Sequence, residues 1–179
     1  YILKKNHLIM KISKIYPVPI TIIFLLIMFS CSVKNNADPQ LAEATGVIKR
    51  VLPGYADRFI LKIIDKEGDK DVFEIEPIGM KIAIRGSSGI AICSGFNYYL
   101  KKYCNSSYNW RCGNNLNIKG DLPADFKKIR KVTPYKYRYM FNYCTFSYSM
   151  SFWDWEQWER MIDWMAMNGI NMPLAPMGQ

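Results

Sequence analysis

Apolar residues recur at helical spacing in two stretches of the amino-terminal half of the chain. In residues 41–52 they fall on one helix face, and Pro53-Gly54 would end that helix; its members are Leu41, Ala44, Val47, Ile48 and Val51. A second stripe follows Arg85-Gly86-Ser87-Ser88-Gly89, which suits a helix cap. That stripe consists of Ile92, Phe96, Tyr99, Leu100 and Tyr103.

Strand-like patterns lie between and after these helices. Residues 59–64, 72–75 and 80–84 are apolar or alternate, and the charged stretch 65–70 contains Gly68, so we expect the first two runs to pair as a hairpin. Residues 108–110 and 116–118 suggest one more short strand pair. A few strands with helices on one side predict a small α/β domain over residues 41–123.

The last quarter of the chain has a different pattern. Residues 137–143 are aromatic and apolar, as in a short buried strand. Ser151, three residues before Asp154, resembles a capping-box start for a helix. That helix would end at Asn168-Gly169, and residues 170–175 form a second apolar run. The expected apolar face of the helix comprises Trp155, Trp158, Ile162, Met165 and Gly169. Strand, helix and strand predict two parallel strands joined by a crossover.

The amino terminus resembles a bacterial lipoprotein signal over residues 1–31. Starting at Met10, it has a basic region, an apolar core at residues 20–29 and small residues before Cys31, the expected lipid attachment site. An ordinary signal peptide is the alternative. A membrane-spanning helix fits less well, because a span needs about 20 apolar residues. We expect an exported protein, lipid-anchored to the membrane in the bacterial cell envelope, with residues 32–40 as a tether.

The net charge of +9 comes partly from this signal. Four lysines lie in or before it, which leaves 20 basic and 15 acidic residues, or +5, in the exported part. The one dense basic cluster, residues 127–131, falls in the expected linker, residues 124–136. Export and the lack of a basic stripe interleaved with stacking aromatics argue against a nucleic-acid partner.

The cysteines do not suggest a metal site. There are five cysteines and one histidine, His7, which precedes the signal, and no C-x-x-C motif is present. Cys104 and Cys112 are near enough in sequence to form a disulfide, a question that the sequence leaves open. Cys93 is expected to be a small buried hydrophobe within a helix.

A family resemblance is carried by the last quarter of the chain. The run N-Y-C-T-F-S-Y-S at residues 142–149 is followed by W-D-W, W-E-R, I-D-W-M-A, N-G-I-N and G-Q up to residue 179. Together with R-G-S-S-G at 85–89 and P-Y-K-Y-R-Y at 134–139, these motifs resemble the α-N-acetylglucosaminidase family. The resemblance implies an exo-acting, retaining glycoside hydrolase that needs no cofactor and releases terminal α-linked N-acetylglucosamine from glycans.

The expected fold is therefore α/β, with a small amino-terminal domain followed by part of a (β/α)8 TIM barrel. Residues 137–179 would form its first strand–helix–strand unit. A complete barrel alone takes about 250 residues. We therefore expect the chain to be a fragment that begins a truncated catalytic domain.

Barrel active sites lie at the carboxyl ends of the strands. Asn142 and Cys144 would lie at that end of the first strand, and Gln179 at that end of the second. The resemblance implies that Asn142 and Cys144 contact the terminal sugar, and Gln179 shares their expected rim. Tyr143, Tyr148 or Trp153 would offer apolar surface to the sugar. The alternative is a buried asparagine and a free core cysteine.

Four carboxylates on the predicted helix invite a catalytic interpretation, since retaining hydrolysis uses two carboxyl groups about 5–5.5 Å apart. They are Asp154, Glu156, Glu159 and Asp163. We expect none of them to be catalytic: this helix would belong to the outer ring, with Asp154 in its first turn and Glu156 paired with Arg160. The resemblance places the catalytic glutamates after Gln179. The alternative function is a non-enzymatic, glycan-binding surface lipoprotein.

Overall fold

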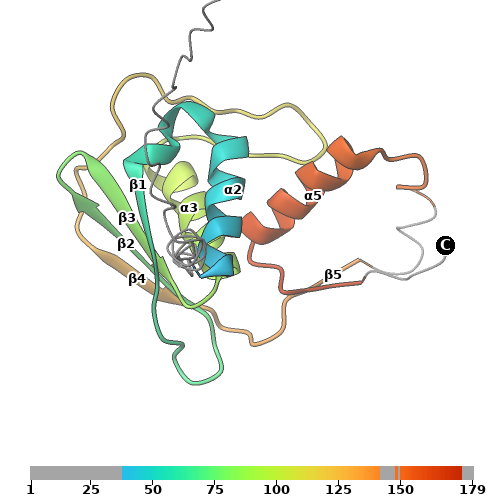
Figure 1. Ribbon diagram of the computed structural model, residues 1–179, viewed down its shortest axis with the longest axis horizontal. Helices are drawn as coiled ribbons and strands as arrows, with labels where there is room; N and C mark the ends of the chain where they lie inside the picture. Colours follow the sequence, from blue (N-terminus) through green and yellow to red (C-terminus); the bar gives the residue numbers. More distant parts are fainter. Residues whose placement is uncertain (1–37, 142–147, 149, 175–179) are drawn as a thin grey trace, which may run out of the picture. The chain divides into compact units, whose positions relative to one another are not determined.

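The structure, a computed structural model, describes residues 38–141, 148 and 150–174 (Figure 1). The predicted signal and the lipidation site Cys31 lie outside these residues. Among the described residues, no helix combines the length and apolar character that crossing a membrane requires.

The first predicted helix is confirmed as α2, Pro39–Val51. Asp38 caps it by accepting a hydrogen bond from the Gln40 amide at 2.9 Å, and Pro39 occupies the first turn, where a missing N–H costs nothing. Its predicted face is buried at Ala44, Val47, Ile48 and Val51. A 3-10 helix, η1, follows at Pro53–Arg58.

Four strands form one sheet in the order β1-β3-β2-β4. Strand β3 pairs in parallel with β1 and antiparallel with β2, and β2 pairs antiparallel with β4 (Figure 1). The bounds are Phe59–Ile63 for β1, Val72–Ile78 for β2, Lys81–Gly86 for β3 and Ile129–Val132 for β4.

The predicted hairpin of the first two strands is wrong, because β3 lies between them. The hairpin forms instead between β2 and β3, where Ile78 pairs with Lys81 across a two-residue turn. Gly79 has φ +58° there, which glycine adopts without steric cost. Strand β3 lies between two other strands, and its apolar residues Ile82, Ala83 and Ile84 suit that position: each is at most 1% exposed.

The expected linker, residues 124–136, contains a strand that was not predicted, β4, and its Arg130 and Lys131 are exposed. Arg130 lies directly opposite Glu74 of β2 and donates to that carboxylate at 3.1 Å. Lys128 also reaches Glu74, at 2.8 Å. Opposite charges on facing strands stabilise such a pair, which explains why a basic stretch forms an edge strand.

The predicted short strand pair after the second helix is also wrong. The structure has a single bridge there, between Ser107 and Asn115, within an otherwise irregular loop.

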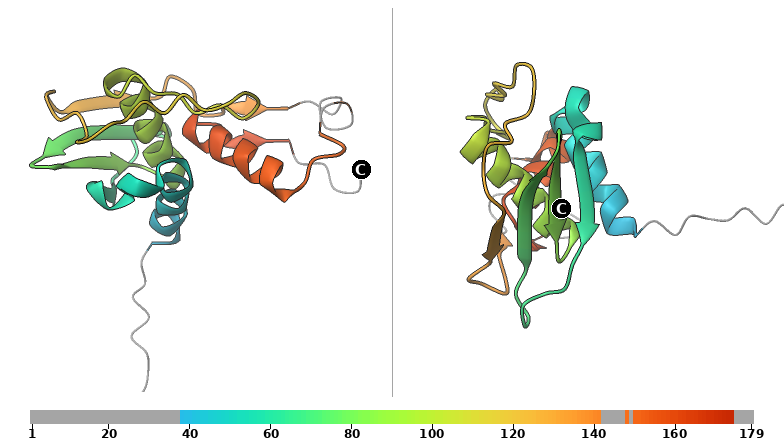
Figure 2. Two further views of the ribbon diagram at one scale, coloured as in Figure 1. Left: turned by 90° about the horizontal axis from the view of Figure 1, so that it is seen from above. Right: turned by 90° about the vertical axis from the view of Figure 1, so that its left-hand side faces the viewer.

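The second predicted helix is confirmed as α3, Gly89–Tyr103, with Ser88 as its cap. Phe96 and Tyr99 are fully buried, and both rings meet Phe59 of β1 edge-on. The buried residues of α2, α3 and the sheet form one core. Residues 39–132, from α2 to β4, are hereafter called the small domain (Figure 2).

The strand–helix–strand order is confirmed, but the prediction of a buried first strand is wrong at Tyr139, which is 54% exposed because its side chain lies on the face away from the helix. Strands β5, Tyr139–Met140, and β6, Met172–Pro173, pair in parallel, with α5, Trp155–Met167, between them in the chain. The helix ends at Asn168, and Gly169 follows with φ +76°. Residues 137–174, as far as they are described, are hereafter called the barrel unit.

Two details of α5 differ from the prediction. Its cap is Asp154 rather than Ser151: Asp154 and Gln157 form a capping box in which each side chain accepts from the other residue's backbone N–H, both at 3.0 Å. The buried face is also rotated. Trp155 is 68% exposed, whereas Met161 is fully buried. The reason is that Met161 and Met165 pack with tryptophans of the loop at 110 and of α5 itself in a second apolar cluster.

Candidate functional site

The predicted sugar-binding rim lies where β5 and β6 end. Met140 pairs with Pro173, and the Leu174 amide donates to the Met140 carbonyl at 2.9 Å. The chain therefore leaves both strands side by side at their carboxyl ends. The three predicted sugar contacts, Asn142, Cys144 and Gln179, lie outside the described residues, so their placement stays a prediction.

Phe141 is the last described residue before Asn142, and its φ is +75°. A bulky side chain rarely takes this left-handed conformation, which costs of order 1–3 kcal/mol and persists only where the surroundings hold it. Phe141 packs against the second apolar cluster, which includes Met161 and Met165 of α5. Packing on this cluster thus holds the last described residue of the segment in its left-handed conformation.

The amino ends of β5 and β6 are joined by Arg138 and Asn171. The Arg138 amide donates to Asn171 Oδ1 at 2.8 Å, and the Arg138 carbonyl accepts from the amides of Asn171 and Met172 at 3.1 and 3.2 Å. Asn171 Nδ2 donates to the Lys136 carbonyl at 2.9 Å. Sequence reasoning missed this pairing, although a polar asparagine inside an apolar run was a signal of it.

The Arg138 side chain connects the barrel unit to the small domain. Its guanidinium lies 2.5 Å from Asp71 Oδ2, donates to the Gly169 carbonyl and reaches the Tyr135 carbonyl at 2.9 Å. Burial alone would raise the pKa of Asp71, but hydrogen bonds from Arg138 and Ser87 outweigh it and hold that pKa below its ordinary value. Asp71 is therefore an ionised, buried carboxylate with a matched partner.

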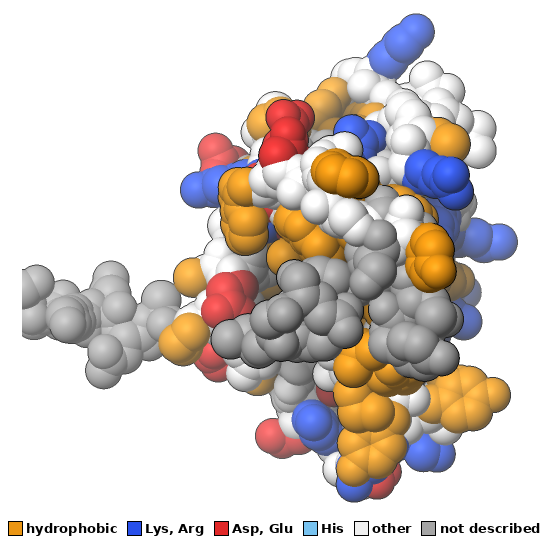
Figure 3. All heavy atoms as spheres, turned by 90° about the vertical axis from the view of Figure 1, so that its right-hand side faces the viewer, with side chains coloured by type: hydrophobic (Ala, Val, Ile, Leu, Met, Phe, Trp, Pro, Cys, Tyr) orange, Lys and Arg blue, Asp and Glu red, His pale blue; other side chains and the backbone are white. Residues whose placement is uncertain are grey.

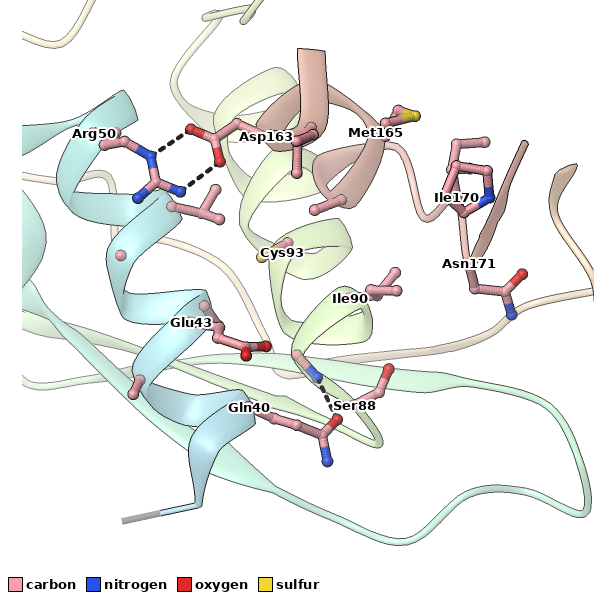
Figure 4. Close-up of a pocket in the computed structure, with 18 residues that line it drawn as sticks. Gln40, Glu43, Arg50, Ser88, Ile90, Cys93, Asp163, Met165, Ile170 and Asn171 are labelled. Carbon is pink, nitrogen blue, oxygen red and sulfur yellow. Dashed lines mark hydrogen bonds and ion pairs between the residues drawn. The ribbon is translucent and has the colours of Figure 1, made fainter. Parts of the chain in front are cut away.

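A second buried ion pair joins α2 to α5. Arg50 donates to both carboxylate oxygens of Asp163, at 2.8 and 2.6 Å, and the Asp163 side chain is 2% exposed (Figure 4). The hydrogen bond to Asp163 raises the pKa of Arg50 above its ordinary value. Asp163 thus has a structural role, and Asp154 caps its helix. Both findings agree with excluding these two carboxylates from catalysis.

The predicted pair of Glu156 with Arg160 is wrong. Arg160 instead donates to the Asn109 carbonyl at 2.9 Å and to Asn114 Oδ1 at 3.0 Å. Arg160 therefore fixes a small-domain loop against α5.

An aromatic hollow of about 570 Å³ lies beside the start of α5. Trp153 contributes to it and meets the rings of Trp110 and Trp158 at centroid distances of 5.6 and 5.2 Å. Tyr148, also on its wall, is 88% exposed. Figure 3 views the side of the molecule where β5 ends and α5 begins, and shows hydrophobic side chains at its surface. Trp153 and Tyr148 thus line one hollow, and their predicted contact with a sugar stays a prediction. Tyr143 lies outside the described residues.

A larger groove of about 690 Å³ runs between α2, α5 and the start of α3 (Figure 4). Cys93 lies in it and is 2% exposed, which confirms its prediction as a buried hydrophobe. Burial raises the pKa of its thiol to about 12, so it stays protonated near neutral pH and is not a nucleophile.

Cys104 and Cys112 are not bonded to each other in the structure: Cys104 is buried and Cys112 exposed, both as free thiols. Among the described residues, no three His, Cys, Asp or Glu side chains group closely enough to hold a metal ion.

Two family descriptions match consecutive parts of the chain. Residues 42–124 match "Alpha-N-acetylglucosaminidase (NAGLU) N-terminal domain", and residues 138–179 match "Alpha-N-acetylglucosaminidase (NAGLU) tim-barrel domain". The first coincides with most of the small domain and the second begins at Arg138.

Individual relatives agree with these matches. The chain is 37% identical to human alpha-N-acetylglucosaminidase over 145 residues, which cover 78% of this chain and 19% of the human protein. It is 44% identical to the family 89 glycoside hydrolase from Clostridium perfringens. Structures of that protein with PUGNAc and with its substrate GlcNAc-alpha-1,4-galactose each match 76% of this chain and 16% of theirs, with a TM-score of 0.73. The chain thus spans less than a fifth of the length of these relatives.

Proposed function

Because the chain belongs to the α-N-acetylglucosaminidase family of glycoside hydrolases, we propose that it forms the amino-terminal part of an exo-acting, retaining enzyme that releases terminal α-linked N-acetylglucosamine from glycoconjugates. The observation that carries this proposal is the match of residues 138–179 to the family's barrel domain. This stretch contains the parallel pair β5–β6, whose carboxyl ends lie side by side.

Within that enzyme, we propose that Asn142, Cys144 and Gln179 form one wall of the sugar pocket. The amide and thiol groups would hydrogen-bond the hydroxyls of the terminal N-acetylglucosamine. The adjacent ends of β5 and β6 support this, since both segments start from one edge. Trp153 and Tyr148 would offer apolar surface from the hollow beside α5, and sugar rings pack on such surfaces through their C–H faces.

The two reacting carboxyl groups would come from other barrel strands. Retaining hydrolysis requires an acid/base and a nucleophile about 5–5.5 Å apart. On α5, Asp163 is held by Arg50 and Asp154 caps the helix, so neither is available to a sugar. A barrel also needs eight strands, of which the described residues supply two. We therefore propose that the 179-residue chain alone is inactive. Hydrolysis by two carboxyl groups uses no cofactor, so we propose none for the enzyme.

The test is hydrolysis of a chromogenic α-N-acetylglucosaminide by the 179-residue chain and by the product of the uninterrupted gene. We expect turnover only by the gene product, with Asn142→Ala raising its KM ~2- to 10-fold, since a lost hydrogen bond to substrate costs about 0.5–1.5 kcal/mol. Turnover by the 179-residue chain, or a gene product that cleaves only other sugars, would contradict the proposal.

The lipoprotein assignment is a separate proposal: the protein is exported and anchored in the bacterial envelope through Cys31. It is supported by the basic, apolar and small-residue order of residues 10–31. Metabolic labelling with palmitate should mark the wild type and not Cys31→Ala. Equal labelling of both would exclude this site, and unlabelled, secreted wild type would indicate an ordinary signal peptide.

A glycan-binding surface lipoprotein without catalysis is the second candidate. The exposed aromatics near α5 favour it, since Phe152 is 99% and Tyr148 is 88% exposed. The coding DNA after Gln179 distinguishes the two. Several hundred further codons with glutamates at strand ends favour the enzyme, and an immediate stop codon favours the binding protein.

A further inference from the structure

Three segments distant in sequence meet at the Arg138 guanidinium. Asp71 comes from the start of β2 in the small domain, the Gly169 carbonyl from the end of α5, and the Tyr135 carbonyl from the segment before β5. The side chains of Arg138 and Asp71 are only 13% and 7% exposed. A charged pair this buried must be fully hydrogen-bonded, because an unpaired charge there would be costly.

Asp71 is also bonded by groups of the small domain and of the segment just after β4. Its Oδ1 accepts from the hydroxyls of Ser87 at 2.9 Å and Ser88 at 3.3 Å, and its carbonyl accepts from the Thr133 amide at 2.9 Å. Ser87 Oγ in turn accepts from the Val72 amide at 2.9 Å. Since Ser88 also caps α3, the carboxylate is fixed to the sheet and to the start of a helix. It is a preorganised acceptor on the small domain.

The backbone of the same arginine joins the two barrel strands. Its N–H and carbonyl are bonded to Asn171 and Met172 at the start of β6. Both β5 and β6 are only two residues long. An isolated two-stranded pair is at best marginally stable, so its own ladder does not suffice to fix its position.

We propose that Asp71 and Arg138 are positioning residues, through which the small domain sets the place of the β5–β6 pair and of the strand ends that lead to the sugar pocket. The consequence for the pocket rests on the function proposed above. The positioning itself does not, since it concerns only contacts between described residues.

Hydrogen exchange of backbone amides in the 179-residue chain tests the positioning. Asp71→Asn keeps the shape and removes the charge. We expect the amides of Asn171, Met172 and Leu174 to exchange ~10- to 100-fold faster, as local opening becomes easier. The amides of Ile75 and Ile84, inside the four-stranded sheet, should change less than ~2-fold. Asp121→Asn is the matched control, because Asp121 pairs with Arg58 at an exposed site of the small domain.

Arg138→Lys provides an independent variant that keeps the charge but loses the planar fork. It should accelerate the same three amides less than Asp71→Asn does. Unchanged exchange at β6 in both variants, or an equal increase at Ile75 and Ile84, would overturn the proposal, since the pair would then be dispensable or merely support global stability.

In an active gene product, Asp71→Asn should raise KM or lower kcat ~10-fold while Asp121→Asn alters neither. An inactive gene product would contradict the proposed function and leave the exchange result standing. Selective exchange at β6 with unchanged kinetics would overturn the link to the sugar pocket.

Discussion

Asp71 and Asp163 are the two buried carboxylates that hold the small domain and the barrel unit together. Each is matched by an arginine from the other part: Arg138 of the barrel unit binds Asp71, and Arg50 of α2 binds Asp163. Each part thus contributes one arginine and one aspartate to the contact between them. Such pairs add little net free energy relative to apolar packing, but a shifted docking would leave a buried carboxylate unpaired. We infer that they select one arrangement of the two parts.

The Arg50–Asp163 pair gives a direct stability prediction. Asp163→Asn should lower the free energy of unfolding by about 2–3 kcal/mol, below the 3–5 kcal/mol of a fully buried broken pair, because water still reaches Arg50. Its side chain is 42% exposed. Urea unfolding followed by tryptophan fluorescence measures the change.

Glu159→Gln is the matched control for this variant. Glu159 lies 3.8 Å from Arg50 and its side chain is 37% exposed, so its loss should cost at most ~1 kcal/mol. If both variants lose the same free energy, burial of Asp163 is not what makes its pair important.

Asp71 gives a pH-dependent prediction. Its pKa is lowered in the folded state, so its stabilising contribution is present above its unfolded pKa of about 3.9 and is lost as pH falls through the lower folded value. Wild type should therefore be more stable than Asp71→Asn by a constant margin between pH 5 and 8, and that margin should shrink below about pH 4. Urea unfolding of both proteins at pH 7, 5 and 3 measures it. A margin unchanged at pH 3 would show that ionisation of Asp71 contributes nothing.

At the scale of helices and strands, the sequence predicted the helices, because their apolar spacing and end residues lie close together in the chain. Periodicity located α2, α3 and α5, and Gly169 marked the end of α5. Strand order failed because it depends on partners far along the chain: β3 inserted between β1 and β2, and β4 formed because Arg130 lies opposite Glu74.

The rim could be predicted only in part. The parallel strands follow from the strand–helix–strand pattern, and the structure confirms their pairing. The contacts that fix them, Arg138 with Asp71 and Asn171, join residues 67 and 33 positions apart. No periodicity in a single sequence reports such partners. The pairing of β5 with β6 brings Asn171 to Arg138, and the docking of the small domain brings Asp71 to it.

The capping box of α5 is predicted to stabilise its first turn. Asp154→Ala should cost about 1 kcal/mol, since it leaves the Gln157 amide without its side-chain acceptor. Asp154→Asn retains an oxygen at the same place and should cost only a few tenths of that. Thermal unfolding of the two variants checks this. Equal losses would mean that the charge, and not the cap, matters at this position.

Close packing of α3 on β3 predicts opposite outcomes for two helical glycines. A Cβ on Gly95 would lie 2.9 Å from Ile84 Cγ2, so Gly95→Ala should destabilise by about 1–2 kcal/mol despite the better helix propensity of alanine. A Cβ on Gly46 would lie 3.3 Å from Arg50 Nη1, the guanidinium nitrogen that does not bond Asp163, so a shift of a few tenths of an ångström accommodates it. Gly46→Ala should therefore stabilise α2 by about 0.5–1 kcal/mol. Urea midpoints measure both, and a stabilised Gly95→Ala would contradict the tight packing.

At the scale of the whole molecule, Met167 of α5 completes the core of the small domain, whereas in the part of the chain that the structure describes one face of β5 and β6 is exposed. Met140 packs toward α5, while its neighbour Tyr139 is 54% exposed and pairs with Met172, which is 43% exposed. Side chains alternate along a strand, so Tyr139 points away from the helix. In a barrel, the face turned away from the helices is the packed interior. The exposed residues of β5 and β6 thus lie where a barrel core would form.

This uncovered face predicts self-association of the 179-residue chain. Apolar strands with a free edge and face pair with other chains, so light scattering after size-exclusion chromatography should show a mass that rises with protein concentration. Replacing Tyr139 and Met172 by lysine should shift the protein toward the monomer, because charges on the face oppose stacking. Ile60→Lys, on β1 of the small domain at 41% exposure, is the control and should leave association unchanged. A wild-type monomer at all concentrations would show that β5 and β6 need no further strands to cover them.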